Sequence, residues 1–357
     1  MSSPKPRRVE FLGKFFADEV RPLINSAGEV EMDRASARFN LVEALAVFAA
    51  VEAGMWLFIG VPGAGKGWAG LTGFTAVGYL LIGLAGIWAL AVSPRLHGDT
   101  LVSFGLPARG EGLAFIRGLR GGRRFAFWIA GVLLCVLLVL NLDFTMRKLG
   151  MRGTWIHEFL ISPDHIPKAP GYIFSVVAGL ALYRIIVLSV IRWDNLLGSV
   201  KAMLLTAIPV WGGILLVGAL MARSSGDWSM FEKFQWIGWD PRRAFIPRSA
   251  HYLFWGMLQQ WAFLGYFHTR IRRGVPPGRF GRTWTSLLSG MIFCIIHIPA
   301  WPLLPVALVA GCFFGYFYQF DRYRNLFVMG LAHGIGGTMV AFLTPIKMSV
   351  GPWSIGR

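Results

Sequence analysis

The sequence predicts an all-α fold, a polytopic bundle of eight or nine transmembrane helices. Hydrophobic residues make up 55% of the 357-residue chain and charged residues only 15%, a balance that soluble domains rarely show. Apolar runs recur from Val42 almost to the C-terminus, and each is close to the roughly 20 helical residues that cross a hydrocarbon core. Because no large soluble domain fits between them, we predict an integral protein of the cytoplasmic (inner) membrane.

Nine apolar segments are candidate spans. They lie near residues 42–60, 71–93, 125–142, 171–191, 202–221, 250–269, 284–299, 302–320 and 325–344. Two longer connecting segments, around 145–170 and 222–248, carry charges of both signs and so obey charge-based topology rules less strictly. In the alternative prediction, one of the nine segments is therefore re-entrant and the protein has eight spans.

The basic residues predict an orientation, because Lys and Arg concentrate in cytoplasmic loops. They cluster in alternate connections: the N-terminal segment, 95–124, 192–201, 270–282 and 322–324. We therefore place these loops and the N-terminus in the cytoplasm. The resulting division is a basic N-terminal segment (1–40), N-terminal transmembrane helices (41–221), an extracytoplasmic loop (222–249), a C-terminal core (250–345) and a tail (346–357).

The formal net charge of +17 raises the possibility of a nucleic-acid partner. The positive residues lie in short clusters between apolar runs, however, where membrane topology and anionic lipid headgroups explain them better. We predict membrane lipids as partners and no nucleic acid. Cys135, Cys294 and Cys312 sit inside apolar segments without metal-type spacing, and we predict neither a metal nor another cofactor.

Three acidic residues lie within or at the edges of predicted spans, where an ionisable group is expensive. We expect Glu43 and Asp143 to reach headgroups or water, because both are close to span ends. Glu52 is deeper, and we expect it to pair with a neighbouring helix.

The last four spans contain three short segments with polar residues. The sequence reads Gln259-Gln260-Trp261-Ala262-Phe263-Leu264-Gly265, then Phe293-Cys294-Ile295-Ile296-His297, then His333-Gly334-Ile335-Gly336-Gly337. In order, spacing and helical setting this resembles the EExxxR, FxxxH and HxxxN signatures of the CPBP family, the glutamate-dependent intramembrane proteases that include the CAAX prenyl endopeptidases. The Gly311–Gly315 run and Asn325-Leu326 are also similar to the family pattern. Gly311 and Gly315 have the spacing that allows close helix packing, within the monomer or between chains.

The resemblance implies a CPBP-like core over residues 250–345 and a role for each motif position. In the family one glutamate activates water, a second glutamate and the arginine organise it, and the second histidine and the asparagine bind the oxyanion. Here Gln259 and Gln260 occupy the glutamate positions, Leu264 the arginine and Gly337 the asparagine. The positions of Phe293, His297 and His333 are kept. All seven residues are our candidate ligand-binding positions, and Gln259, Gln260, His297 and His333 the candidate catalytic ones.

The substitutions change the chemistry that the site can perform. A carboxamide has no useful acid–base equilibrium near neutral pH, so glutamine cannot replace the general base. Glycine at position 337 also removes a donor for the oxyanion, an interaction often worth about 3 kcal/mol. From the predicted topology, the two glutamines and the two histidines lie roughly 12 to 21 Å deep and can converge in one cavity that opens to the cytoplasm.

Several functions fit this pattern. Our leading hypothesis is a protein that is not a protease and uses the cavity to bind a lipid, a prenyl chain or a partner membrane protein in a scaffolding or regulatory role. The alternatives are an enzyme of altered chemistry in which His297 or His333 acts on a lipid or isoprenoid, and a residual CAAX-type endopeptidase. Interhelical hydrogen bonding, at about 0.6 to 2 kcal/mol per contact, would also explain buried Gln and His. A metal site lacks an evident third ligand, and a transporter lacks paired broken helices.

Overall fold

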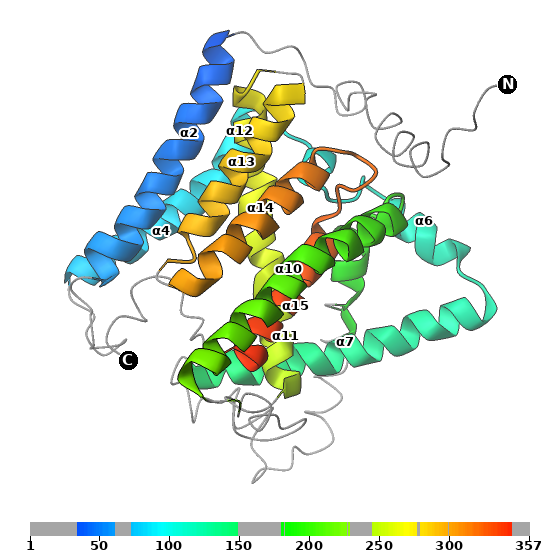
Figure 1. The fold of residues 1–357 in the computed structure, drawn as a ribbon. Coiled ribbons are helices and arrows are strands. Elements are labelled where there is room, and N and C mark those ends of the chain that lie inside the picture. Colours follow the sequence, from blue (N-terminus) through cyan, green and yellow to red (C-terminus); the bar gives the residue numbers. More distant parts are fainter. Residues whose placement is uncertain are drawn as a thin grey trace, which may run out of the picture.

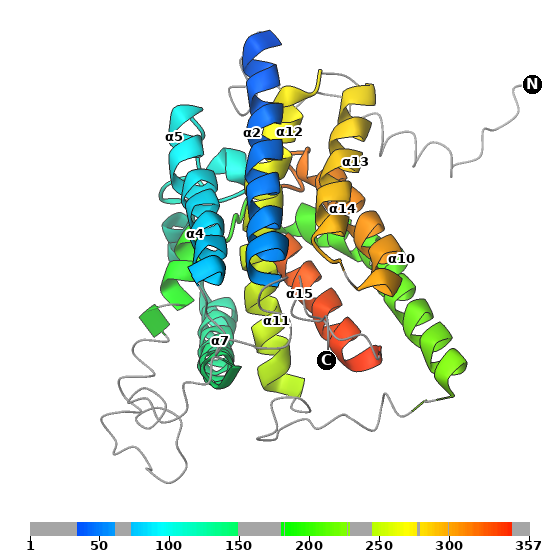
Figure 2. The ribbon, with the colours of Figure 1, turned by 90° about the vertical axis from the view of Figure 1, so that its left-hand side faces the viewer.

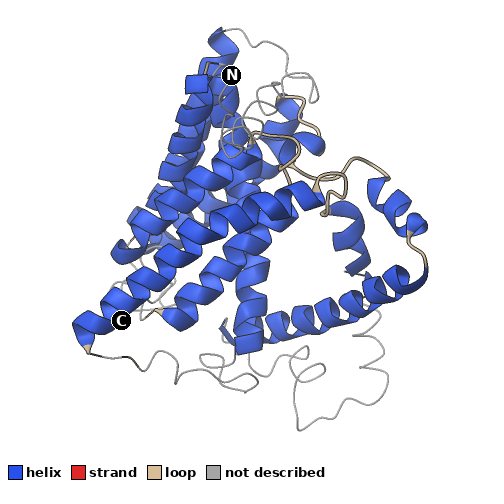
Figure 3. Cartoon of the chain, turned by 45° about the vertical axis from the view of Figure 1, so that its right-hand side comes forward, coloured by secondary structure: helices blue, strands red, loops and turns tan. Residues whose placement is uncertain are grey.

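The computed structural model describes residues 34–60, 73–148, 180–181, 183–226, 228, 245–276, 279–298 and 300–344. In these residues every regular element is a helix (Figures 1 and 3). Among the described residues, five helical segments are long and apolar enough to cross a membrane: Ala37–Phe58, Ala76–Leu96, Leu196–Ser225, Trp301–Tyr318 and Leu326–Leu343. The predicted all-α transmembrane class is therefore confirmed, and the chain is an integral membrane protein.

The other four predicted spans have mixed outcomes. Three are helical but are not among the five above: they fall in α7 (Gly121–Lys148), in α11 (Phe245–Gln260) with its continuation, and in α13 (Arg279–Ile295). About half of the segment near 171–191 lies outside the described residues, and its described part is helical at 180–181 and 183–189. The total of eight or nine spans stays a prediction.

Two N-terminal helices form one edge of the bundle (Figure 2). The first is α2 (Arg34–Ala53), which continues as the π-helical η3 (Gly54–Gly60). The second is α4 (Gly73–Ile87), which continues through η5 (Trp88–Val92) into α5 (Ser93–Leu96). They approach closely at Gly54, where an added Cβ would stand 2.9 Å from the carbonyl oxygen of Gly78.

Short elements and two long helices connect this edge to the C-terminal core. The turn η6 (Val102–Phe104) and helix α6 (Glu111–Gly118) precede α7, which crosses the lower part of the bundle in Figure 1. Helix α7 packs against the 183–189 stretch, where the Tyr183 hydroxyl donates to the Phe127 carbonyl at 2.7 Å. Helix α10 (Leu196–Ser225) then packs against α14 and α15.

The C-terminal core is built from four helical segments. Helix α11 runs without a break through the π-helical η8 (Trp261–His268) into α12 (Thr269–Gly274), because the residues at both junctions keep right-handed helical dihedrals. Helix α13 is followed by a tight turn, the short η9 (Trp301–Leu303) and α14 (Leu304–Tyr318). Helix α15 (Leu326–Leu343) ends the described chain.

Glycines set the two closest helix crossings in this core. A Cβ added at Gly256 of α11 would stand 2.6 Å from the Gly334 nitrogen and 2.7 Å from the Gly330 oxygen, so α11 and α15 touch through their backbones. Likewise Gly311 of α14 lies against Gly290 of α13, where an added Cβ would be 2.8 Å from the Gly290 Cα. The predicted packing role of Gly311 is thus confirmed within the monomer.

The connections that we predicted to share one side of the membrane meet at one end of the bundle. We call this the basic end, formed by residues 93–105, 192–195, 270–273 and 321–325. There Arg192 bonds Asp321 through both terminal nitrogens, at 2.8 and 2.9 Å. The guanidinium also holds the pKa of the Asp321 carboxyl below its ordinary value by these hydrogen bonds. The loops thus share one end, while the membrane face that it meets stays a prediction.

A glycine substitution tests the α11–α15 crossing. In Gly334→Ala the new Cβ would lie 2.5 Å from the Leu253 Cα, which is backbone and cannot move aside. We expect the free energy of unfolding to fall by about 1 to 3 kcal/mol or more. The control is Gly212→Ala on α10, where nothing lies within 4 Å of the added Cβ and the melting temperature should hold or rise. Equal melting temperatures for the two variants in detergent would contradict this crossing.

Candidate functional site

The continuous helix α11–η8 presents the first motif. Gln260 is fully buried, at 0% exposure, together with Leu264 and Phe263 on the side that faces the core. Gln259 is half-buried, because neighbouring residues on a helix point about 100° apart. The structure therefore places one of the two predicted glutamines in the interior and leaves the other nearer the surface of the helix.

His297 does not lie on a helix, contrary to the helical setting predicted for it. Helix α13 ends at Ile295, and His297 occupies the turn that follows. The sequence is consistent with this end, because Pro299 follows His297 two residues later and a proline disfavours helical dihedrals at residue 298 and cannot donate a helical hydrogen bond. The side chain is still buried, and its Nδ1 lies 2.6 Å from the Phe293 carbonyl oxygen.

Phe293 connects the three motif helices. Its ring centroid lies 5.2 Å from that of Phe263 on η8 and 4.7 Å from that of His297. It also lies 5.0 Å from the ring of His333 on α15, and the two imidazoles are 6.3 Å apart. The predicted convergence of His297 and His333 is therefore present in the structure, with Phe293 packed against both.

Gln260 approaches this cluster through the helix crossing. It lies one turn, about 6 Å, beyond Gly256, and Gly256 touches the backbone of Gly334 beside His333. No hydrogen bond joins Gln260 to His297 or His333 in the described part of the chain. The glutamine and the histidines thus line one region of the interior without being bonded to each other.

The two remaining motif positions are buried and apolar. Leu264 is 2% exposed in η8, and Gly337 is buried one turn after His333 on α15. Neither side chain can hold a carboxylate in place or donate to an oxyanion. The site therefore has a polar group at Gln260, two imidazoles and otherwise hydrocarbon.

Polar atoms at this site lack hydrogen-bond partners. Both the oxygen and the nitrogen of the Gln260 carboxamide are buried and unpaired, and so is Nδ1 of His333. Each such group costs about 1 to 3 kcal/mol of stability. Native proteins keep few of them, and a ligand or water that pairs with them is the usual reason.

The expectation that Glu43 reaches headgroups or water is wrong. Glu43 is 6% exposed; its carboxylate accepts from Trp88 at 2.9 Å and from the Tyr266 hydroxyl at 3.1 Å, and lies 2.7 Å from His97 Nε2. The fully buried Arg270 lies 3.9 Å away and pairs with Asp99. We call these residues the Glu43 cluster.

The Glu43 cluster was not predictable from short-range spacing. Its members come from α2, η5, the 97–99 turn, η8 and α12, which are up to 227 residues apart in the chain. The sequence offered one signal, an ionisable residue within an apolar run. Of the members of this cluster, that signal identified only Glu43. Because its acidic and basic groups are largely paired with one another, the cluster holds helices together. Glu52 keeps one unpaired oxygen, and the Asp143 side chain lies outside the described residues.

This site offers few ligands for a metal ion. Among the described residues, no three His, Cys, Asp or Glu side chains gather as a metal site requires. His297 and His333 would supply two imidazoles at most, and glutamine is a poor third ligand.

Comparison with known proteins supports the resemblance for one part of the chain. A family model described as "Type II CAAX prenyl endopeptidase Rce1-like" matches residues 243–339, about a quarter of the sequence. All the motif positions from Gln259 to Gly337 fall within that match. No curated protein and no solved structure matches the chain.

Two buried glutamines, one with an unpaired amide nitrogen and one with a paired one, provide a matched test. In Gln260→Leu the removed group has no partner, so we expect the free energy of unfolding to rise by about 1 to 3 kcal/mol and the melting temperature to rise with it. Gln319 is similarly buried and its Oε1 is also unpaired, but its Nε2 donates to Ser286 at 3.1 Å and to the Arg282 carbonyl at 3.1 Å. Gln319→Leu should therefore lower the melting temperature. If Gln260→Leu is the more damaging of the two in ligand-free protein, its carboxamide is paired after all.

Proposed function

Starting from a membrane protein whose residues 243–339 match a CAAX prenyl endopeptidase family, we propose that this chain binds a prenyl or lipid chain without hydrolysing a peptide. Its role would be scaffolding or regulatory. The observation that carries the proposal is the Gln260 carboxamide, buried and unpaired at the position of a family glutamate.

The change at the two glutamate positions supports the loss of hydrolysis. In the CPBP family a glutamate takes a proton from water during peptide hydrolysis, and the side chains at 259 and 260 are carboxamides. Neither Leu264 nor Gly337 supplies a compensating charge or donor. Four of the six polar motif positions have therefore lost the function that the family resemblance assigns to them.

The retained features favour binding. Phe293 packs against both histidines and Phe314 against His333, and Phe263 packs against Phe293; such aromatic rings suit an apolar chain. Gln260 offers two donors and one acceptor to a polar group on that chain, such as a carbonyl or hydroxyl. Ligand sites commonly combine an apolar lining with a few polar groups in this way. A transmembrane helix of a partner protein is the alternative occupant.

One observation favours a second candidate, a membrane enzyme of altered chemistry. The Nδ1–H of His297 donates to the Phe293 carbonyl, which leaves Nε2 as the unprotonated nitrogen of the neutral ring. Such a nitrogen can take a proton from a lipid or isoprenoid substrate. Loss of one lipid product in both His297→Ala and His333→Ala strains would support this candidate over binding alone.

Photolabelling with a diazirine-bearing farnesyl probe tests the binding proposal. We expect the purified chain in lipid nanodiscs to be labelled near η8 and α15, and unlabelled farnesyl compound to compete. Gln260→Leu should raise the half-saturating probe concentration by about fivefold to tenfold, because one hydrogen bond to the ligand is lost.

Gln319→Leu is the control, since Gln319 packs against α13 and lies outside the motif cluster. It should label like the wild type. If labelling is not competed, or if Gln260→Leu and the wild type saturate alike, the carboxamide does not bind the chain.

A further inference from the structure

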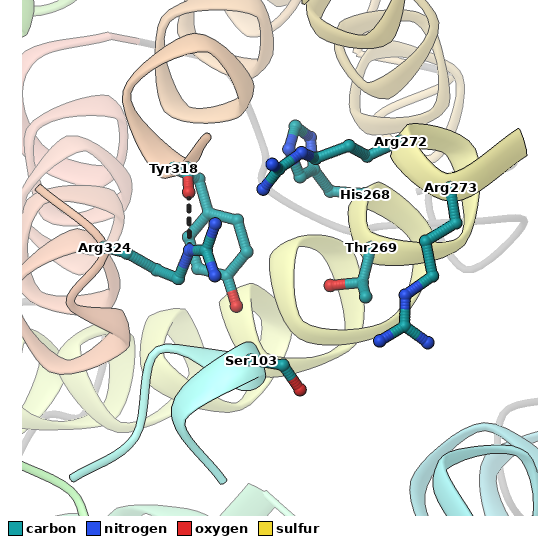
Figure 4. Close-up of a pocket in the computed structure, with 7 residues that line it drawn as sticks. All are labelled: Ser103, His268, Thr269, Arg272, Arg273, Tyr318 and Arg324. Carbon is teal, nitrogen blue, oxygen red and sulfur yellow. Dashed lines mark hydrogen bonds between the residues drawn. The ribbon is translucent and has the colours of Figure 1, made fainter. Parts of the chain in front are cut away.

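A small cavity lies at the basic end, away from the motif cluster (Figure 4). Three parts of the chain line it: η6, the η8–α12 junction, and the end of α14 with the turn that follows it. His268 lies about 12 Å along the helix from Gln260. The cavity is therefore separate from the site where we place the prenyl chain.

The lining is strongly basic. It includes the guanidinium groups of Arg272, Arg273 and Arg324, and none of its lining residues is acidic. Among nearby carboxylates, Asp99 is 2.5 Å from Arg273 and also pairs with Arg270, and Asp321 pairs with Arg192. Positive charge thus exceeds negative charge around the cavity.

Two buried nitrogen atoms at the cavity have no hydrogen-bond partner among the described residues. His268 is 1% exposed; its Nδ1 lies 2.9 Å from the Ser289 hydroxyl, and its Nε2 has no hydrogen-bond partner. If the Ser289 hydroxyl donates to Nδ1, Nε2 carries the proton and offers it to the cavity. The buried Nη1 of Arg273 is unpaired as well. Such nitrogen atoms beside excess positive charge favour an anion as the ligand.

The size and position of the cavity define the anion further. Its volume of about 10 Å³ holds about one water molecule, and so one oxygen of a larger group. Buried His268 and Tyr318 form its inner part, while Arg272 and Arg273 are only half-buried. One oxygen can enter while the rest of the group stays between the arginines, which match phosphate by their planar, multiple donors.

We propose that this cavity binds a phosphate group, with one oxygen inside it and the arginines of α12 around the others. The source is the headgroup of an anionic membrane lipid or free phosphate, which share this chemistry. The end of a transmembrane bundle lies at headgroup level, which suits the lipid. The inference does not depend on the function proposed above.

Melting temperatures of the purified full chain in neutral detergent test the proposal. One series adds phosphatidic acid against phosphatidylcholine, and the other adds inorganic phosphate against chloride at constant ionic strength. We expect phosphatidic acid to stabilise the wild type in a saturable manner. In Arg272→Gln the half-saturating concentration should rise about tenfold, as expected when a charged donor to phosphate is lost.

The matched control is Arg282→Gln, which removes the same charge near the basic end but from a residue that does not line the cavity. It should respond like the wild type. If Arg272→Gln does not fold, Arg272→Lys takes its place. It keeps the charge but lacks the planar, multiple donors of the guanidinium, and should weaken binding about threefold. A response to phosphatidic acid alone identifies a lipid site, and an equal response to inorganic phosphate identifies free phosphate. No stabilisation by either, or equal weakening in Arg272→Gln and Arg282→Gln, overturns the proposal.

Discussion

The backbone contact between α11 and α15 is the constraint on which the rest of the core depends. Gly256, Gly330 and Gly334 leave no room for a side chain between the two helices. Within a membrane, where lipid is as apolar as leucine, such close packing is a main source of helix association. The contact lies beside His333 and one turn from Gln260, so the packing that holds the core also positions the site.

Two groups of buried polar residues show what that core tolerates. In the Glu43 cluster, hydrogen bonds and ion pairs join acidic and basic side chains from several helices. Around Gln260 and His333, polar atoms are buried without partners. Paired groups are consistent with a structural role, whereas unpaired groups reduce stability and are expected where a protein binds something. The difference separates the structural cluster from the candidate site.

The sequence predicted the parts of the structure that depend on local pattern. Apolar runs predicted the helical class, and motif spacing predicted that His297 and His333 converge. The sequence pattern did not predict the π-helical η8 or the turn that contains His297. It also failed for the partners of Glu43, because the fate of a buried carboxylate depends on helices that are distant in sequence. His268 likewise gained its role from Ser289 and Arg324, which the fold alone brings near.

We propose that the site has kept its position and lost its base. Mass spectrometry of a farnesylated CAAX peptide incubated with the purified full chain in nanodiscs is the decisive test. We expect the peptide to stay intact at enzyme and substrate concentrations where an active CAAX endopeptidase, run in parallel, cleaves it. Cleavage by this chain that disappears when Gln259→Ala and Gln260→Ala are combined would contradict it.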